Sequence, residues 1–304
     1  MQIDKGSIEQ KDWDDLLMLI KMQKCTPFVG SGASYPNLPM GKEVAHEWSS
    51  RYNYPLIKDS NDLAKVSQFM AIDRFPMFPK HILSQDFKTK SSPDFSRKDD
   101  PHGILADLNL PIYITTNYDN FMLEALKTRH KSPKRELCRW SSELEQILNF
   151  KSISPILKAG YTPTPEIPLV YHLHGLLEIP ESIVMTENDY LDFMIRLHEK
   201  ETPILPPEIT IALATNALLF VGYSLADWDF RVLFRGIFNT ISSMTNLIVA
   251  VQLRPTDVTN EKDAIQYLSK YFGSVLGEGI KVRVFWGEAS EFAKELRDQW
   301  EDAS

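Results

Sequence analysis

The chain has 304 residues, of which 43% are hydrophobic and 24% are charged, so it can bury the core of one large or two modest domains. Its 41 acidic residues outnumber its 33 basic ones, and the resulting net charge of −8 argues against a surface that wraps nucleic acid by itself. No apolar run reaches the roughly 18 to 20 residues of a membrane span, and the N-terminal segment lacks a signal-peptide core, so we expect a cytoplasmic protein.

The first part of the chain combines one short strand with long helical stretches. Apolar residues at helical spacing predict a helix over residues 12–22, and an apolar run predicts a buried strand over 25–29 that breaks at a Gly-Ser-Gly sequence. The pattern over 41–84 is helical, with prolines as punctuation. The polar stretch 88–102 is predicted to be a mobile loop.

The rest of the chain alternates strands and helices. Strands are predicted over residues 111–115, 169–174, 217–221, 247–252 and 281–285, and helices over 118–128, 141–150, 187–199 and 227–238. Six apolar strands alternating with helices predict an α/β fold with a Rossmann-like parallel sheet of about six strands, covered on both faces. We expect a single domain over 1–304 with its core at approximately 12–40, 105–130 and 165–304, and helical insertions at approximately 41–104 and 131–164.

In such a sheet ligands bind outside the carboxyl ends of the strands, so the residues that follow each strand are candidates for a site. The first strand is followed by Gly30, Ser31, Gly32, Ala33 and Ser34. Glycines there let the backbone approach a pyrophosphate, and free amides favour an anion. A simple tight turn explains the pattern equally well, because the third glycine of the dehydrogenase fingerprint is missing and no P-loop sequence occurs.

The second strand is followed by Thr116, Asn117, Tyr118 and Asp119. Asn117 and Asp119 can both project into one pocket, where an amide can hold a water or a ribose hydroxyl and a carboxylate can accept a hydrogen bond from a carboxamide. The alternative is that one of them caps the helix predicted to begin near residue 118.

The third strand supplies two histidines, His172 and His174, with Gly175 next to the second one. Histidine is the side chain best suited to proton transfer near neutral pH. His-x-His could also be half of a metal site, but no third ligand stands nearby. A hydrogen-bonded core histidine is the alternative for His172, whereas His174 at the strand tip is expected to be the more exposed of the two.

The fourth strand end carries Gly222, Tyr223, Ser224 and, three residues later, Asp227. The backbone amides and the Ser224 hydroxyl could hold a second phosphate or a ribose. Asp227 could equally be the N-cap of the helix that follows.

Taken in order, the sequences G-S-G-A-S, T-T-N-Y-D, H-G and G-Y-S-L-x-D resemble the sirtuin superfamily, and more closely the bacterial sirtuin-like NADase branch of anti-phage defence systems, over about residues 28–285. The resemblance implies that residues 30–34 form a phosphate-binding turn and that 222–224 lie near the adenosine half of NAD. It also implies that Asn117 and Asp119 lie beside the nicotinamide ribose and carboxamide, and that His174 is the general base.

Three departures from the sirtuin pattern point away from acyl-lysine recognition and leave NAD binding intact. The chain has only two cysteines, Cys25 and Cys138, so it cannot build the four-cysteine zinc module of deacylating sirtuins, and we expect no zinc. Thr116 stands where glutamine normally precedes the asparagine. The motif after the first loop is reduced to Leu38-Pro39.

The resemblance implies an NAD⁺ glycohydrolase that releases nicotinamide and ADP-ribose and depletes NAD during anti-phage defence. Alternatives are an NAD-dependent deacylase or ADP-ribosyltransferase with the same pocket, and a non-catalytic NAD or ADP-ribose sensor. Hydrolysis and cyclisation both stay open, because water access to the pocket decides between them. By analogy, we expect a homo-oligomer and a partner in trans, such as a HerA-type ATPase or an Argonaute protein, which would make any DNA contact.

Overall fold

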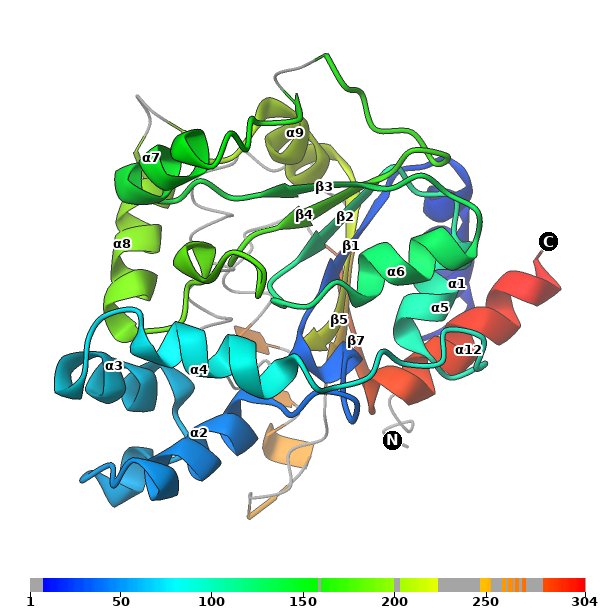
Figure 1. Ribbon diagram of the computed structural model, residues 1–304. Helices are drawn as coiled ribbons and strands as arrows, with labels where there is room; N and C mark the ends of the chain where they lie inside the picture. Colours follow the sequence, from blue (N-terminus) through cyan, green and yellow to red (C-terminus); the bar gives the residue numbers. More distant parts are fainter. Residues whose placement is uncertain are drawn as a thin grey trace.

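The computed structural model describes residues 8–157, 160–199, 203–223, 247–252, 259–260, 262–264, 266–267, 270–271 and 281–303 (Figure 1). Two predicted site residues, Ser224 and Asp227, and the helix predicted over 227–238 lie outside the described residues. Across the part of the chain that is described, no helix is both long enough and apolar enough to cross a membrane.

Seven parallel strands form one sheet within the described residues, in the order β3-β4-β2-β1-β5-β6-β7. Their bounds are β1 Cys25–Val29, β2 Ile112–Thr115, β3 Lys134–Leu137, β4 Leu169–His172, β5 Ala217–Tyr223, β6 Leu247–Gln252 and β7 Lys281–Trp286. The predicted Rossmann-like parallel sheet is thus confirmed. The predicted third strand is shorter than expected, because β4 ends at His172 rather than at His174.

The structure adds the edge strand β3, which lies in the stretch 131–164 that the sequence assigns to a helical insertion. Its sequence, KREL, has one apolar residue and therefore gives no strand signal. Pairing with β4 sets its conformation, with Glu136 opposite Tyr171 and Leu137 opposite His172. Glu136 is buried, and its Oε2 accepts a hydrogen bond from the backbone N–H of Ile156 at 2.6 Å, so the chain that follows covers this edge.

Alternating side chains along each strand feed two separate cores, one on each face of the sheet. Phe28, Ile112 and Ile114 point to the first core, whereas Val29 and Tyr113 point to the second. The first core is covered by α7 (Ser142–Phe150), α8 (Glu187–Leu197) and α9 (Pro207–Thr215). The second is covered by α1 (Gln10–Lys21), α5 (Pro101–Asp107), α6 (Phe121–Thr128) and α12 (Ala289–Asp302), and Figure 1 shows the two groups on opposite sides.

Three further helices, α2 (Gly41–Arg51), α3 (Leu63–Asp73) and α4 (Phe78–Phe87), share a small core of their own. That core includes Ile183 and Met185 from the segment after β4. Two buried serines connect these helices to the segment after β4. Ser67 Oγ donates to Met185 O and Ser84 Oγ donates to Leu177 O, both at 3.1 Å. These helices therefore pack on the chain segment that carries His174.

The predicted loop over 88–102 ends earlier than expected, because α5 begins at Pro101. Asp100 caps this helix, with its Oδ1 accepting a hydrogen bond from Gly103 N at 2.6 Å. His102 is consequently a buried helical residue, with its ring edge-to-face against Phe121. The stretch that the sequence predicts as a loop is anchored to the core at its end.

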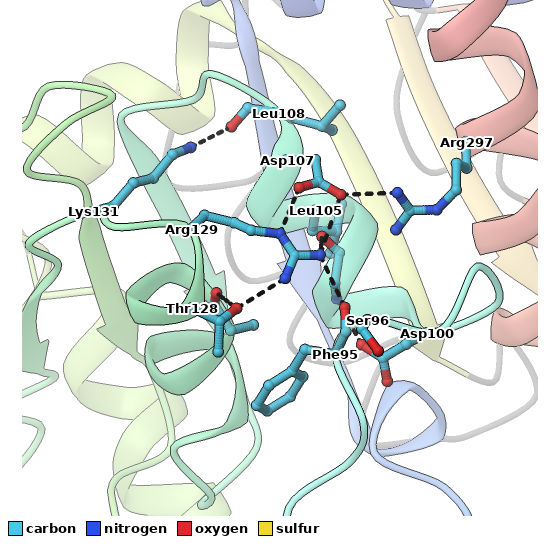
Figure 2. Close-up of polar contacts among 12 residues, drawn as sticks. Phe95, Ser96, Asp100, Leu105, Asp107, Leu108, Thr128, Arg129, Lys131 and Arg297 are labelled. Carbon is cyan, nitrogen blue, oxygen red and sulfur yellow. Dashed lines mark hydrogen bonds and ion pairs between the residues drawn. The ribbon is translucent and has the colours of Figure 1, made fainter.

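A cluster of one carboxylate and two guanidinium groups fastens the C-terminal helix to α5 and α6 (Figure 2). Asp107 accepts from Arg129 Nε at 2.5 Å and from Arg297 Nη1 at 2.9 Å. Arg129 also donates to Phe95 O at 2.9 Å. The three charged side chains are largely buried, so one carboxylate compensates two cations that water reaches poorly.

Replacing Asp107 by Asn should therefore lower the free energy of unfolding by about 3 kcal/mol, near the lower limit for breaking a buried ion pair. Chemical denaturation by urea, followed by circular dichroism, measures the loss. Asp73→Asn is the matched control, because Asp73 pairs with Arg74 on the surface and both side chains are more than half exposed. The control should cost no more than about 1 kcal/mol. Equal losses in the two variants would show that the cluster is not a clamp.

Candidate functional site

The four strand ends predicted to form a site are neighbours in the sheet, in the order β4-β2-β1-β5. Val29 pairs with Thr115 on one side and with Val221 on the other, and Thr115 pairs with His172. Asn117 and His174 each lie two residues beyond the Thr115–His172 pair. The predicted residues at these ends therefore meet at one edge of the sheet, as expected for parallel strands.

The orientation of the Asn117 side chain is fixed by its neighbours. Its Nδ2 donates to the backbone O of Gly30 and to Ser34 Oγ, each at 3.0 Å. Because a backbone carbonyl can only accept, the amide nitrogen must face Gly30, and both of its hydrogens are used. The Asn117 Oδ1 is thereby presented as an acceptor. The backbone of Asn117 is held as well, because Thr115 Oγ1 accepts from Asn117 N at 2.9 Å and donates to Val29 O at 3.0 Å.

Ser34 connects Asn117 to Asp119. Ser34 is buried, and its Oγ donates to Asp119 Oδ2 at 2.9 Å while it accepts from Asn117. Burial raises the pKa of Asp119 to about 6, so the carboxylate is ionised at neutral pH and sets the direction of this hydrogen-bond chain. Asp119 Oδ1 also accepts from Phe121 N at 2.9 Å. Asp119 therefore holds the first residue of α6, but the N-cap residue is Asn120, so neither Asn117 nor Asp119 is the cap.

The turn after β1 and the end of β5 pack backbone against backbone. Residues Ser31–Ala33 form the short 3-10 helix η1, and Gly30 N donates to Val221 O at 2.8 Å. Gly222 has a φ of +82°, and a Cβ on it would lie 2.3 Å from Ala33 N and 2.8 Å from Gly30 O. A side chain at Gly222 would thus displace the turn. The predicted glycines of the two strand ends are required by their contact with each other.

Tyr223 and Thr116 hold each other at the same edge. Tyr223 Oη donates to Val29 O at 3.0 Å and lies 2.9 Å from Thr116 Oγ1. The Tyr223 ring lies edge-to-face against Phe28 and Phe220, with centroid distances of 5.9 Å to each. Tyr223 therefore links the predicted site to the sheet core.

His172 and His174 occupy different surroundings. The Nδ1 of His172 lies 3.2 Å from Asn117 O, so His172 supports the backbone of Asn117, in agreement with the core-histidine alternative. The His174 ring packs edge-to-face on Tyr190 and Phe193 of α8, with centroid distances of 5.5 and 5.2 Å. His174 is 5% exposed and His172 1%, so His174 is the more exposed of the two, as expected, but both rings are buried because α8 covers the end of β4. The Nε2 atoms of both rings are buried without a partner among the described residues.

The backbone around His174 is set by Ser182, a residue that the sequence analysis missed. Gly175 has a φ of +91°, and a Cβ there would lie 2.2 Å from Ser182 O. Ser182 Oγ accepts from Leu176 N at 2.9 Å, and Ser182 O accepts from Trp140 Nε1 at 2.8 Å. A lone serine in an irregular segment gives no sequence signal for this role, because its partners are distant in the chain or are backbone atoms.

In the part of the chain that the structure describes, neither a metal-binding cluster nor a disulfide lies at this edge of the sheet. Among the described residues, no group of three or more histidines, cysteines or acidic residues is arranged to hold a metal ion. Cys25 and Cys138 are both buried and do not form a disulfide. Two surface cavities of about 390 and 470 Å³ lie elsewhere, one between α6 and β3 and the other along α2.

Three buried histidines should make the protein less stable in acid. Burial lowers the pKa of His102, His172 and His174 to about 3 each. The folded state keeps these rings neutral, whereas the unfolded chain takes up protons below about pH 6.5, so stability falls as the pH drops from there towards 3. Asp100 and Asp119, whose pKa values burial raises to about 6, oppose this, because the folded state protonates them first.

We expect the melting temperature to fall as the pH is lowered from 7 to 5, because the three histidines outweigh the two aspartates. His102→Leu should flatten the curve, because each such histidine contributes up to about 1.4 kcal/mol per pH unit. Differential scanning fluorimetry in a buffer series measures both curves. A melting temperature that rises with acidification, or an unchanged slope in the variant, would contradict the assignment.

A family model described as "SIR2-like domain" matches residues 111–276, more than half of the chain. The chain belongs to the SIR2-like family. This confirms the resemblance to the sirtuin superfamily. The matched region contains Asn117, Asp119, His174 and Gly222, whereas the turn at Gly30 precedes it.

Two curated relatives of this SIR2-like protein are both named "NAD(+) hydrolase ThsA". The protein of Bacillus cereus (strain MSX-D12) is 29% identical over 137 residues, which are 44% of this chain and 24% of that protein. The protein of Enterococcus faecium is 25% identical over 127 residues, which are 41% of this chain and 22% of that protein. The matched part thus spans about a quarter of the length of these relatives.

A solved structure described as "Structural Basis for the Mechanism and Regulation of Sir2 Enzymes" aligns with 96% of this chain and 98% of its own, at 12% identity and a TM-score of 0.38. The family assignment rests on the family model and not on this alignment.

Proposed function

We propose that this SIR2-like protein is an NAD⁺ glycohydrolase that releases nicotinamide and ADP-ribose. Its family and the names of the two ThsA relatives support the reaction. The observation that carries the proposal is the fixed amide of Asn117. Both hydrogens of its Nδ2 are donated to Gly30 O and Ser34 Oγ, so only the acceptor Oδ1 is left for a ligand. An acceptor at this position can hold and orient a water or a ribose hydroxyl.

The proposed reaction breaks the bond between nicotinamide and C1′ of the ribose and leaves an oxocarbenium-like sugar that water attacks. Asn117 orients the attacking water or the ribose. His174 is the proposed proton acceptor: its ring is neutral at physiological pH because burial lowers its pKa to about 3, and the same burial makes it a weaker base than a free histidine. Asp119 is ionised above about pH 6 and can accept from the carboxamide as well as from Ser34. Residues 30–34 and 222–223, with Thr116, form the proposed NAD-binding wall.

Incubation of the purified protein with NAD tests the proposal, with nicotinamide, ADP-ribose and cyclic ADP-ribose quantified together by chromatography. Equal amounts of nicotinamide and ADP-ribose without any acceptor are expected. Nicotinamide release that needs an acetylated peptide would instead indicate a deacylase or transferase, and saturable NAD binding without product would indicate a sensor. Cyclic ADP-ribose as the main product would replace hydrolysis by cyclisation.

The wider role that we propose is NAD depletion during anti-phage defence, in the cytoplasm. An unrestrained NADase would harm its own cell, so control by assembly or by a partner is expected. The proposed assembly is a homo-oligomer, with a HerA-type ATPase or another defence protein as the partner in trans. Light scattering of the chain alone, and mixed with the product of a neighbouring gene, tests both: a monomer in each case would contradict this part.

A further inference from the structure

The cavity between α6 and β3 carries an excess of positive charge on a protein whose net charge is −8. Lys127, Lys134 and Arg135 line it, together with the acids Glu124 and Glu178. Arg135 and Glu178 form an ion pair of 2.7 Å, whereas Glu124, which accepts a hydrogen bond from a serine hydroxyl at 2.5 Å, keeps its charge, so the lining carries a net charge of +1. Neither lysine ammonium has an ion pair or hydrogen bond among the described residues. The cavity therefore offers two exposed ammonium groups to an anion.

The volume of the cavity and the apolar residues that line it indicate which class of anion it can hold. The cavity volume of about 390 Å³ falls in the range of small-molecule sites, roughly 300 to 1,000 Å³. Leu123 and Pro133 contribute apolar surface beside the charged groups. A phosphate would accept from the lysines, and a flat base would cover the apolar wall. We propose that this cavity is an effector site for a phosphorylated ligand of the size of a nucleoside monophosphate.

Asn120 connects this cavity to the segment that carries Asn117. Its Oδ1 accepts from Arg135 Nη1 at 2.9 Å, and its Nδ2 donates to Glu178 Oε1 at 2.6 Å, so it bridges the Arg135–Glu178 pair. Asn120 lies three residues after Asn117 and is the N-cap residue of α6. A phosphate beside Arg135 would repel Glu178 and compete with it for the guanidinium. Loss of the Asn120 bridge would loosen the end of the segment that carries Asn117. The rate of nicotinamide release would then fall.

The experiment uses AMP as the probe and compares two double charge reversals. Lys127→Glu/Lys134→Glu removes the proposed phosphate contacts. Lys88→Glu/Lys90→Glu changes the net charge equally on an exposed stretch that does not line the cavity. Equilibrium dialysis with labelled AMP should show binding weakened by about tenfold or more in the first variant only, because attraction becomes repulsion. Equal AMP binding by all three proteins would overturn the site.

The rate measurement rests on the proposed NADase activity. In the parent protein, AMP should lower kcat for nicotinamide release at saturating NAD, whereas competition at the NAD site would raise KM alone. The cavity variant should lose this inhibition relative to its own rate without AMP. Asn120→Ala should bind AMP and lose the inhibition. AMP binding without any change in kcat would overturn the effector role. If no nicotinamide is released at all, the proposed function fails, and the binding comparison alone decides on the cavity.

Discussion

Asn117→Ala should lower the rate of nicotinamide release by at least about 10²-fold, because loss of one fixed polar group that serves the reacting centre typically costs 10² to 10³ in rate. The substitution removes the acceptor Oδ1 and the Nδ2 donor to Ser34 Oγ and Gly30 O, although Gly30 O still accepts from Ala33 N. Steady-state release of nicotinamide at saturating NAD measures the effect, and melting temperatures show whether the fold survives.

Asn216→Ala is the matched control. Asn216 is also a buried asparagine, and its Nδ2 donates to Thr26 Oγ1 at 3.0 Å, but it precedes β5 and so lies at the opposite edge of the sheet. The control should lose a similar amount of stability, about 1 kcal/mol, and keep its turnover. His174→Ala should resemble Asn117→Ala. Full turnover in both site variants, or an equal loss in the control, would refute the assignment.

Gly222→Ala should lower the free energy of unfolding by about 3 kcal/mol and abolish tight NAD binding. The added methyl would lie 2.3 Å from Ala33 N, closer than atoms can approach, so the turn after β1 must move. The left-handed φ of +82° adds a cost of about 1 to 2 kcal/mol for any residue with a Cβ. Urea denaturation and isothermal titration of NAD into an Asn117→Ala background, which avoids turnover, measure the two losses.

Gly160→Ala separates the conformational cost from the steric one. Gly160 has a similar φ of +79°, but a Cβ there would meet nothing within 4 Å. This control should therefore lose only about 1 to 2 kcal/mol and bind NAD like the parent protein. If Gly222→Ala costs no more than Gly160→Ala and still binds NAD, the packing of the two strand ends does not maintain the site.

The sheet and the list of candidate residues could be predicted because they depend on local patterns. Short apolar runs such as Cys25–Val29 mark buried parallel strands, and the residues after them fall at the ligand-binding edge of any such sheet. The order of the strands was not available from these runs. Only the tertiary structure shows that the four chosen ends are neighbours, and β3 stayed hidden because its polar sequence is made a strand by its partner β4.

The chemical state of the site depended wholly on contacts between distant residues. Asn117 is oriented by Gly30, 87 positions earlier in the chain, and α8 buries His174 and thereby lowers its pKa. From the residue pattern alone it followed that an asparagine, an aspartate and a histidine come directly after strands of a parallel sheet. Hydrogen-bond direction and desolvation arise only when separate segments pack together, so the atom that Asn117 presents and the charge of His174 follow from the folded structure alone.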